Sequence, residues 1–189
     1  MREFEPPRRF ESHGIVLRPW GMHDAEAMSQ AVEQSYEHLR PFLPWATASQ
    51  PPEDCRELIR TFSKSYETQT DFVISIWDAQ SNELLGGTGF HLRIGTLKLA
   101  QAEIGMWIRQ SCAACGVGTR ALLAMTEWGF DAWPWLRLEW HCDAANRASC
   151  RVAKKAGYKL EARLRKNRIN RAGERSDTLI FGRLKSDTV

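Results

Sequence analysis

The sequence contains no long hydrophobic run. None of its stretches approaches the roughly 20 apolar residues that a membrane span needs. The opening MREFEPPRRF is charged and has no signal-peptide apolar region. These absences predict a cytoplasmic protein that does not associate with membranes. Cysteine is also scarce: five residues, an odd number without regular spacing, fit a reducing compartment better than a secreted disulfide scaffold.

Neither sign of charge dominates the composition. The 26 Lys and Arg residues stand against 23 Asp and Glu residues, and this mild excess argues neither for nor against an anionic partner. Internal repeats, low-complexity tracts and linkers are missing too. With 189 residues, 43% of them hydrophobic, the chain can bury one sizeable core. We therefore expect an irregular arm over residues 1–13 and a single domain over residues 14–185.

What the sequence does contain is an alternation of helical and strand-like hydrophobic periods. The predicted helices cover residues 24–37, with Asp24 as the N-cap, 52–70, 117–132 and 146–157. The predicted strands cover residues 14–20, 71–79, 83–94, 98–110, 135–143, 158–166 and 175–185. The segment LRPFLPW, residues 39–45, contains two prolines and is predicted to be a loop. Short turns between the strands of residues 71–110 suit antiparallel hairpins, so the fold class is α+β with a mixed sheet.

A glycine-rich turn, AACGVGTRAL, lies between a predicted strand and a predicted helix. Gly116 and Gly118 remove side chains beside the free N–H groups of a helix start, which is the arrangement of a backbone anion site. A tight turn without a ligand is the alternative interpretation. A phosphate-binding P-loop is excluded because Gly118 is followed by Thr-Arg and not by Lys. The hairpins and the missing third glycine argue against a dinucleotide-binding Rossmann turn.

A second polar motif, NRASCRVAKKAGY, opens with Asn146 where a helix is predicted to begin. Asn146 could serve only as the N-cap, and Gly157 only as the C-terminal stop. That interpretation leaves Ser149 unexplained. Because Ser149 comes three residues after Asn146, an amide and a hydroxyl lie side by side on one helix face.

The order AEIGMWI, GVGTRAL and NRASCRVAKKAGY resembles the GNAT superfamily of acetyl-CoA-dependent N-acetyltransferases. The opening IVLRPW, DAEAM and LRPFLPW is similar to its ribosomal-protein N-terminal acetyltransferase branch (RimJ/RimL-like), and the resemblance runs from about Ile15 to Leu184. It implies a GNAT-like, mainly antiparallel sheet flanked by helices, with a splayed central strand pair. It also implies direct transfer of an acetyl group from acetyl-CoA to a primary amine, either a protein N-terminus or a small amine.

The resemblance implies a coenzyme A site as well. The pyrophosphate would lie on the backbone of Cys115, Gly116, Val117, Gly118 and Thr119, and main-chain groups near Trp107 and Ile108 would hold the pantetheine arm and the acetyl carbonyl. The chain departs from the family at two positions. Ala113 replaces a usual Gln or Arg, and Cys115 replaces a usual basic residue. Because backbone contacts remain, we expect weaker or differently supported cofactor binding, with Arg120 as a candidate substitute for the missing charge.

Acetyl transfer needs a base for the amine, donors for the oxyanion and a proton for the thiolate. The resemblance assigns Glu103 as the base, with a solvated edge carboxylate or a water chain as the alternatives. It assigns Ser149 as the proton donor to sulfur and Asn146 as the residue that orients the cofactor or a water. The oxyanion donor would be a backbone N–H near Trp107 or Ile108. The loop of residues 39–45 and the helix of residues 52–70 are expected to form the acceptor lip.

Three alternative functions are open. A covalent route through Cys115 or Cys150 is disfavoured because no His lies nearby in the sequence. The spacing CAAC, residues 112–115, is typical of redox and zinc sites, but it lies after hairpin strands and has no second pair, so no metal is expected. The segment RLRKNRINRAGER carries six Lys or Arg residues, which fits a non-catalytic ribosome-associated or RNA-binding protein, or an acyl-CoA carrier. Without interleaved aromatics nucleic acid is not the expected partner, and a homodimer is left open.

Overall fold

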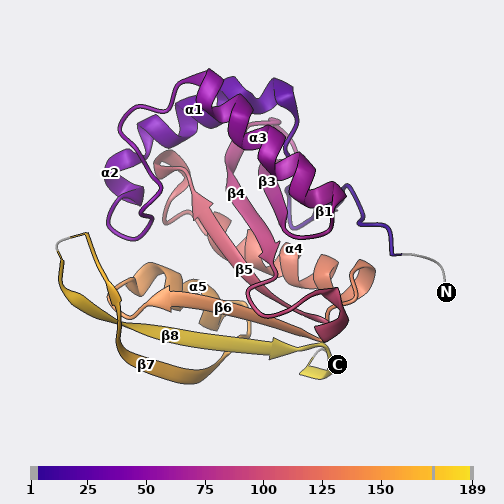
Figure 1. Ribbon diagram of the computed structural model, residues 1–189, viewed down its shortest axis with the longest axis vertical. Helices are drawn as coiled ribbons and strands as arrows, with labels where there is room; N and C mark the ends of the chain where they lie inside the picture. The colour runs from indigo at the N-terminus through magenta and orange to yellow at the C-terminus, as the bar shows by residue number, and fades with distance from the viewer. Residues whose placement is uncertain (1–3, 172, 188–189) are drawn as a thin grey trace.

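The computed structural model describes residues 4–171 and 173–187. Within them, eight strands form one sheet in the order β1-β2-β3-β4-β5-β6-β8-β7 (Figure 1). The strands are β1 (Phe10–Ser12), β2 (Ile15–Pro19), β3 (Phe72–Asp78), β4 (Leu84–His91), β5 (Gln101–Ile108), β6 (Arg137–Asp143), β7 (Lys159–Ile169) and β8 (Arg175–Leu184). The α-helices are α1 (Ala25–Gln34), α2 (Tyr36–Leu39), α3 (Pro52–Glu67), α4 (Val117–Ala132) and α5 (Arg147–Lys155). The predicted α+β class is confirmed, since every neighbouring strand pair except β5–β6 is antiparallel.

The N-terminal arm is shorter than expected. Residues 10–12 form β1, which pairs with β2 so that Phe10 lies opposite Leu17. The Phe10 ring stacks on Trp128 at a centroid distance of 5.9 Å, and burial of this aromatic pair explains why the segment is ordered against the sheet. The expectation of an irregular arm up to residue 13 was therefore wrong for these residues.

The first predicted helix is divided, and Asp24 is the N-cap residue of α1 without a side-chain capping hydrogen bond. The helix of residues 24–37 ends at Gln34 and resumes as α2; between them the buried Ser35 hydroxyl accepts a hydrogen bond from the Gln110 N–H at 2.9 Å. The buried Asp24 carboxylate accepts two hydrogen bonds from the Arg18 guanidinium, at 2.6 and 2.8 Å. The predicted N-cap position is therefore confirmed, but the buried carboxylate binds the Arg18 guanidinium and the Gly21 N–H instead of the free N–H groups of α1.

Helices cover both faces of the sheet. On one face, α1 and α3 pack on alternate residues of β2 and β3, Val16 and Trp77 among them. On the other face, α4 packs on Ile15, Leu17 and Ile74 in the larger core. The alternation follows from the strand period of two. Among the described residues, no helix has the length and apolar character required to cross a membrane.

The centre of the sheet splits. The parallel strands β5 and β6 pair at only three positions, the last of which joins Glu103 to Glu139. Beyond that pair the two strands diverge, as Figure 1 shows. The predicted splayed pair is therefore confirmed, and the edge of β5 from Ile104 onward has no neighbouring strand on that side among the described residues.

Candidate active site

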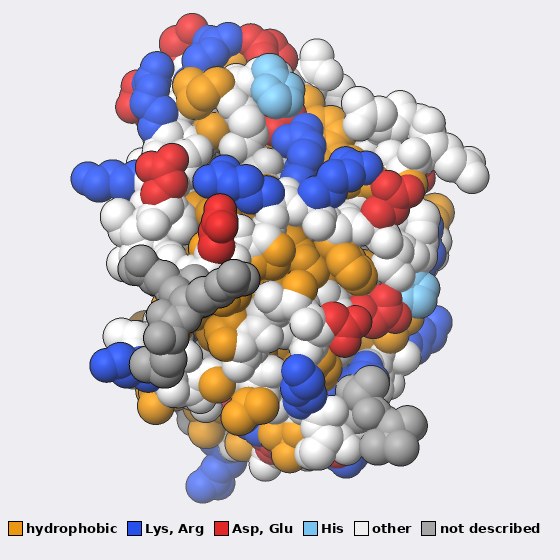
Figure 2. Space-filling model, turned by 90° about the vertical axis from the view of Figure 1, so that its right-hand side faces the viewer, with side chains coloured by type: hydrophobic (Ala, Val, Ile, Leu, Met, Phe, Trp, Pro, Cys, Tyr) orange, Lys and Arg blue, Asp and Glu red, His pale blue; other side chains and the backbone are white. Residues whose placement is uncertain are grey.

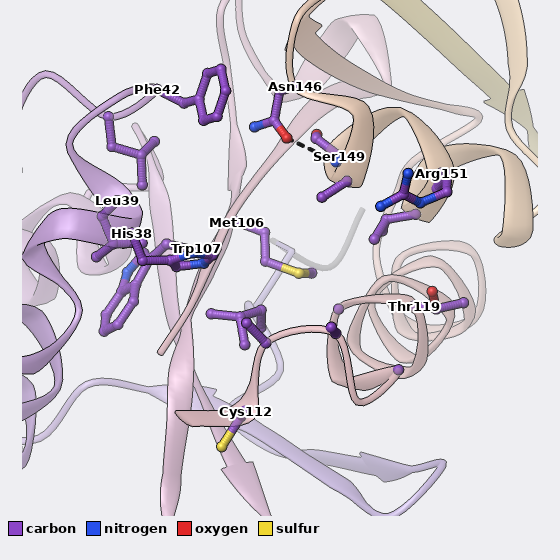
Figure 3. Close-up of a pocket in the computed structure, with 18 of the residues that line it drawn as sticks. His38, Leu39, Phe42, Met106, Trp107, Cys112, Thr119, Asn146, Ser149 and Arg151 are labelled. Carbon is purple, nitrogen blue, oxygen red and sulfur yellow. Dashed lines mark hydrogen bonds between the residues drawn. The ribbon is translucent and has the colours of Figure 1, made fainter. Parts of the chain in front are cut away.

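A cleft of about 450 Å³ opens where β5 and β6 separate. Its volume is that of a small-molecule site. Met106 and Trp107 both line it, although adjacent residues of a strand point to opposite faces. The cleft therefore passes through the sheet, from the side of α4 and α5 to the side of α2 (Figure 3).

The glycine loop forms the wall of the cleft at the start of α4. Gly116 has a φ of +80°, a left-handed conformation that favours glycine. A Cβ on Gly118 would lie 3.4 Å from a methyl carbon of Val152, so a small residue lets α4 approach α5. Within the described part of the chain, the N–H groups of residues 115–118 donate no hydrogen bond. Four free donors at a helix N-terminus fit an anionic group such as a pyrophosphate.

Not every predicted loop residue lies in the cleft. Gly116, Gly118 and Thr119 line it, whereas Val117 packs in the core and Cys115 is exposed outside it. Arg120, predicted to substitute for the missing charge, does not line the cleft. Its guanidinium donates to the carbonyl oxygen of His13 at 2.9 Å, because position 120 faces the β1–β2 turn.

The opposite wall is the N-terminal end of α5. The Asn146 side-chain oxygen accepts the Ser149 N–H at 3.0 Å, so Asn146 is the N-cap and also lines the cleft. The Ser149 hydroxyl oxygen accepts a hydrogen bond from the indole Nε1 of Trp140 at 2.9 Å. This contact holds the hydroxyl oxygen at the cleft wall, where its hydrogen can be donated either to the neighbouring Cys142 sulfur or into the cleft.

Sequence reasoning missed three residues of this wall. Trp140 lines the cleft from β6, and Arg151 and Lys155 line it from α5. Arg151 points toward the cavity in Figure 3, and neither cation forms an ion pair with any described residue. The cleft-lining positions 148, 151, 152 and 155 recur at helical spacing, which was a usable signal. Use of this spacing to predict cleft residues required knowledge of which face of α5 meets the glycine loop, and the sequence does not show that.

Glu103 does not line the main cleft. It lies at the last β5–β6 pair, where 17% of its side chain is exposed. Its carboxylate is 3.2 Å from Nδ1 of His141 and 3.8 Å from Nε of Arg93. His141 also contacts the Glu139 carboxylate through Nε2 at 2.8 Å. The structure thus places Glu103 in a charged cluster at the vertex of the split and apart from Ser149.

The predicted acceptor lip is only half present. His38, Leu39, Phe42 and Leu43 line the cleft on the α2 side. The following Trp45 packs edge-on against Trp107 with centroids 6.0 Å apart, which holds the loop against β5. The other expected part was wrong, because α3 contributes no residue to the cleft lining and packs on α1 instead.

Cys142 belongs to the core, and Cys150 packs against it. Cys150 packs on the core with its sulfur 3.5 Å from that of Cys142. Burial, and next the contact with Cys150, raise the pKa of the Cys142 thiol to about 12, so it is a poor nucleophile at neutral pH. Cys112 lines the cleft, but its sulfur points away from the centre in Figure 3. Among the described residues, no cluster of three or more His, Cys, Asp or Glu side chains could hold a metal ion.

A split sheet, a helix start with free N–H groups and a facing polar helix define an acyltransferase-like architecture. The chain matches the model of the acetyltransferase (GNAT) domain over residues 15–159. This match covers most of the chain, and the protein therefore belongs to the GNAT acetyltransferase family. It is an acetyl-CoA-dependent N-acetyltransferase. No curated protein matches the sequence at a significant level.

Solved structures share the fold. One is the RimL ribosomal L7/L12 alpha-N-protein acetyltransferase in complex with coenzyme A, with a TM-score of 0.82, 21% identity and coverage of 92% of this chain and 95% of that chain. Another is the ribosomal-protein-S5-alanine acetyltransferase from Vibrio fischeri, with a TM-score of 0.82, 17% identity and coverage of 96% of this chain and 98% of that chain. A third is the microcin C7 self-immunity acetyltransferase MccE in complex with acetyl-CoA and AMP. Its TM-score is 0.80 at 21% identity, and the match covers 92% of this chain and 93% of that chain. At these identities the likeness concerns the fold.

Proposed function

We propose that the protein acetylates the N-terminal amine of another protein by direct transfer from acetyl-CoA. The observation that carries this proposal is the cleft through the sheet, because it lets two substrates approach β5 from opposite sides. The likeness to ribosomal-protein acetyltransferases supports a protein acceptor over a small amine. An apolar lip of Leu39, Phe42 and Leu43 suits the first side chains of a peptide.

The walls of the cleft fit the chemistry of the co-substrate. Acetyl-CoA supplies the activated acetyl thioester. The free N–H groups of residues 115–118 would hold its pyrophosphate, with Thr119 beside them. Arg151 and Lys155 would supply the positive charge that positions 113 and 115 lack. The unpaired edge of β5 near Trp107 and Ile108 would hold the pantetheine arm and the acetyl carbonyl.

Replacing both cations of α5 should weaken acetyl-CoA binding. We expect Arg151→Ala combined with Lys155→Ala to raise the dissociation constant by about tenfold or more, because two charge-assisted contacts to phosphate are lost. Isothermal titration calorimetry measures the change. Lys154→Ala is the matched control, because Lys154 is an exposed cation of the same helix that does not line the cleft. Equal losses in both variants would contradict a specific phosphate contact.

Three groups of the protein each serve one step of the acetyl transfer: removal of the amine proton, stabilisation of the oxyanion and protonation of the leaving sulfur. Glu103 takes the proton of the attacking amine, directly or through water, from its place at the vertex of the split. Backbone N–H groups of β5 near Trp107 or Ile108 stabilise the oxyanion. Ser149 donates its hydroxyl hydrogen to the departing sulfur and regains a proton from water, to which Glu103 releases the proton it took, while Trp140 holds the hydroxyl oxygen and Asn146 holds the helix end.

Removing the Ser149 hydroxyl should affect turnover more than binding. We expect Ser149→Ala to lower kcat by about 10-fold to 100-fold with less change in acetyl-CoA affinity, because its hydrogen bond strengthens as charge develops on sulfur. Trp140→Phe should give a smaller loss of kcat, since the hydroxyl stays but loses the indole that orients it. Steady-state kinetics separate kcat from KM. A loss confined to KM would assign Ser149 to binding alone.

An acceptor screen tests the proposed function. Peptides with a free N-terminus, the same peptides with a blocked N-terminus and an internal lysine, and spermidine are each incubated with acetyl-CoA. Mass spectrometry of the products locates the acetyl group, and we expect it on the free N-terminus. Acetylation of spermidine alone would replace the protein acceptor by a small amine. An acetyl adduct on Cys115 or Cys150 in intact-protein spectra, discharged by adding peptide, would overturn direct transfer.

A further inference from the structure

The charges of the chain are segregated along the sequence. Residues 144–187 contain 13 Lys and Arg against 4 Asp and Glu. The rest of the chain contains 13 Lys and Arg against 19 Asp and Glu. The small net charge of +3 therefore hides a strongly basic C-terminal part and an acidic remainder. Such an asymmetry favours an anionic partner at the basic part.

Several hairpin cations have no carboxylate partner. We call the β7–β8 hairpin, residues 159–184, the basic hairpin. Arg163 pairs with Asp177 at 2.6 Å, but Arg165, Lys166 and Arg168 form no side-chain ion pair with any described residue. On α3, by contrast, Arg56 pairs with Glu26 and Glu53, and Arg60 with Glu57. Figure 2 shows this mixture of acidic and basic side chains over the helical upper half of one face. The basic hairpin thus carries a run of neighbouring cations, residues 165–168, without an ion pair to any described carboxylate.

The outer strand of the basic hairpin is open to a partner. All of β7 is exposed except the half-buried Ala162. The sheet order ends at β7, so its outer edge pairs with no other described strand. An open edge offers backbone hydrogen bonds to an extended peptide. Exposed Leu160, Leu164 and Ile169 would add apolar contacts.

The basic hairpin is continuous with the acceptor side of the cleft. From its tip, the Arg171 guanidinium donates to the carbonyl oxygens of Pro44 and Ala46, both at 2.8 Å. These residues follow Phe42 and Leu43, which line the cleft. Figure 1 shows the tip beside the loop after α2. Basic residues on an edge strand also oppose aggregation, but that role does not require contact between the hairpin and the acceptor loop.

We propose that the basic hairpin docks an acidic, extended segment of the acceptor protein while that protein's N-terminus lies in the cleft. The inference rests on the proposed function, because it gives the acceptor a chemical class. The 11 residues of β7 span at most about 35 Å at 3.3 Å per residue, and register shifts after Leu160 and after Leu164 divide this edge into shorter regular pieces. RNA is disfavoured, since the only aromatic residues between 144 and 187, Tyr158 and Phe181, are buried and cannot stack on bases.

Two synthetic twelve-residue peptides test the docking. Both begin with a free Ser-Gly-Gly-Gly; the rest alternates Asp with Gly in one peptide and Asn with Gly in the other. Fluorescence anisotropy gives their dissociation constants, and acetyl transfer gives their KM. We expect the acidic peptide to bind at least about tenfold more tightly at low salt, and the ratio to fall as salt is added. Equal binding of the two peptides would overturn the docking surface.

Charge reversal locates the surface. We expect Arg165→Glu with Arg168→Glu to abolish the preference for the acidic peptide and to leave acetyl-CoA affinity unchanged. Lys64→Glu with Lys98→Glu makes the same change of charge at exposed sites elsewhere and should keep the preference. Tighter binding of a twelve-nucleotide single-stranded RNA than of the acidic peptide, lost in the hairpin variant, would overturn the proposal. So would a change of oligomeric state in that variant, which would assign the surface to a second copy of the chain.

The two readouts separate the two proposals. Preferential binding of the acidic peptide without acetylation of either peptide supports the docking surface and contradicts the proposed function. Acetylation of both peptides with equal KM and equal affinity supports the proposed function and contradicts the docking surface.

Discussion

Gly118→Glu should lose acetyl-CoA binding. The new side chain would start 3.4 Å from Val152 and extend into the cleft between α4 and α5. Its carboxylate would take the free N–H groups of the loop and repel the pyrophosphate, so we expect the dissociation constant to rise by about 100-fold or more. Calorimetry with acetyl-CoA measures the loss, and thermal unfolding shows whether the variant is folded.

Gly118→Ala is the matched control. Its Cβ makes only an ordinary van der Waals contact with Val152, and position 118 has no left-handed φ that an alanine would strain. We expect this variant to bind acetyl-CoA within about threefold of the wild type, as is usual for a small change without a named penalty. If Gly118→Glu binds acetyl-CoA as well as Gly118→Ala does, the pyrophosphate does not lie on this loop.

Glu103→Gln should slow turnover without changing acetyl-CoA binding. The amide keeps the shape of the side chain but cannot take a proton from the amine. If Glu103 is the sole base, we expect kcat at neutral pH to fall by about 100-fold or more. Because Glu103 lies outside the cleft lining, the dissociation constant of acetyl-CoA should stay the same. The pH dependence of kcat is measured for the variant and the wild type.

Glu139→Gln is the control that distinguishes a catalytic base at Glu103 from a carboxylate whose role is only to contact His141. Both carboxylates contact the His141 ring, Glu103 at Nδ1 and Glu139 at Nε2. A structural role for the cluster predicts similar effects of the two changes. A base at Glu103 predicts a much larger effect of Glu103→Gln. Superimposable pH–rate profiles for Glu103→Gln and wild type would make Glu103 a structural residue and direct attention to a water chain.

The sequence allowed the elements and their order to be predicted better than the contacts between them. The predicted helix of residues 117–132 matches the bounds of α4, because apolar residues repeat along it at helical spacing and Gly116, at a φ of +80°, precedes its first residue. Hydrophobic periods also located the hairpins of β3, β4 and β5. They did not show the break at Ser35, nor its hydrogen bond with Gln110, 75 positions away. A local pattern contains no information about such a partner.

The same limit applies to the site. Asn146 and Ser149 were predictable because one helix turn brings them together. Trp140 was not, since its contact with Ser149 exists only after α5 has packed on β6. For Arg120 the sequence shows the charge but not the contact with the His13 carbonyl oxygen. The site is made of tertiary contacts, and only its local parts can be predicted from motifs.

The split between β5 and β6 has a thermodynamic consequence. Within the described chain, β5 from Ile104 to Ile108 lacks one row of strand partners, so part of the central sheet is incomplete in the protein alone. A ligand that fills this gap binds the folded state and not the unfolded chain. By linkage, each tenfold excess of such a ligand over its dissociation constant adds about 1.4 kcal/mol to the free energy of unfolding. The stability of this fold in a cell would then follow the supply of the molecule that occupies its sheet.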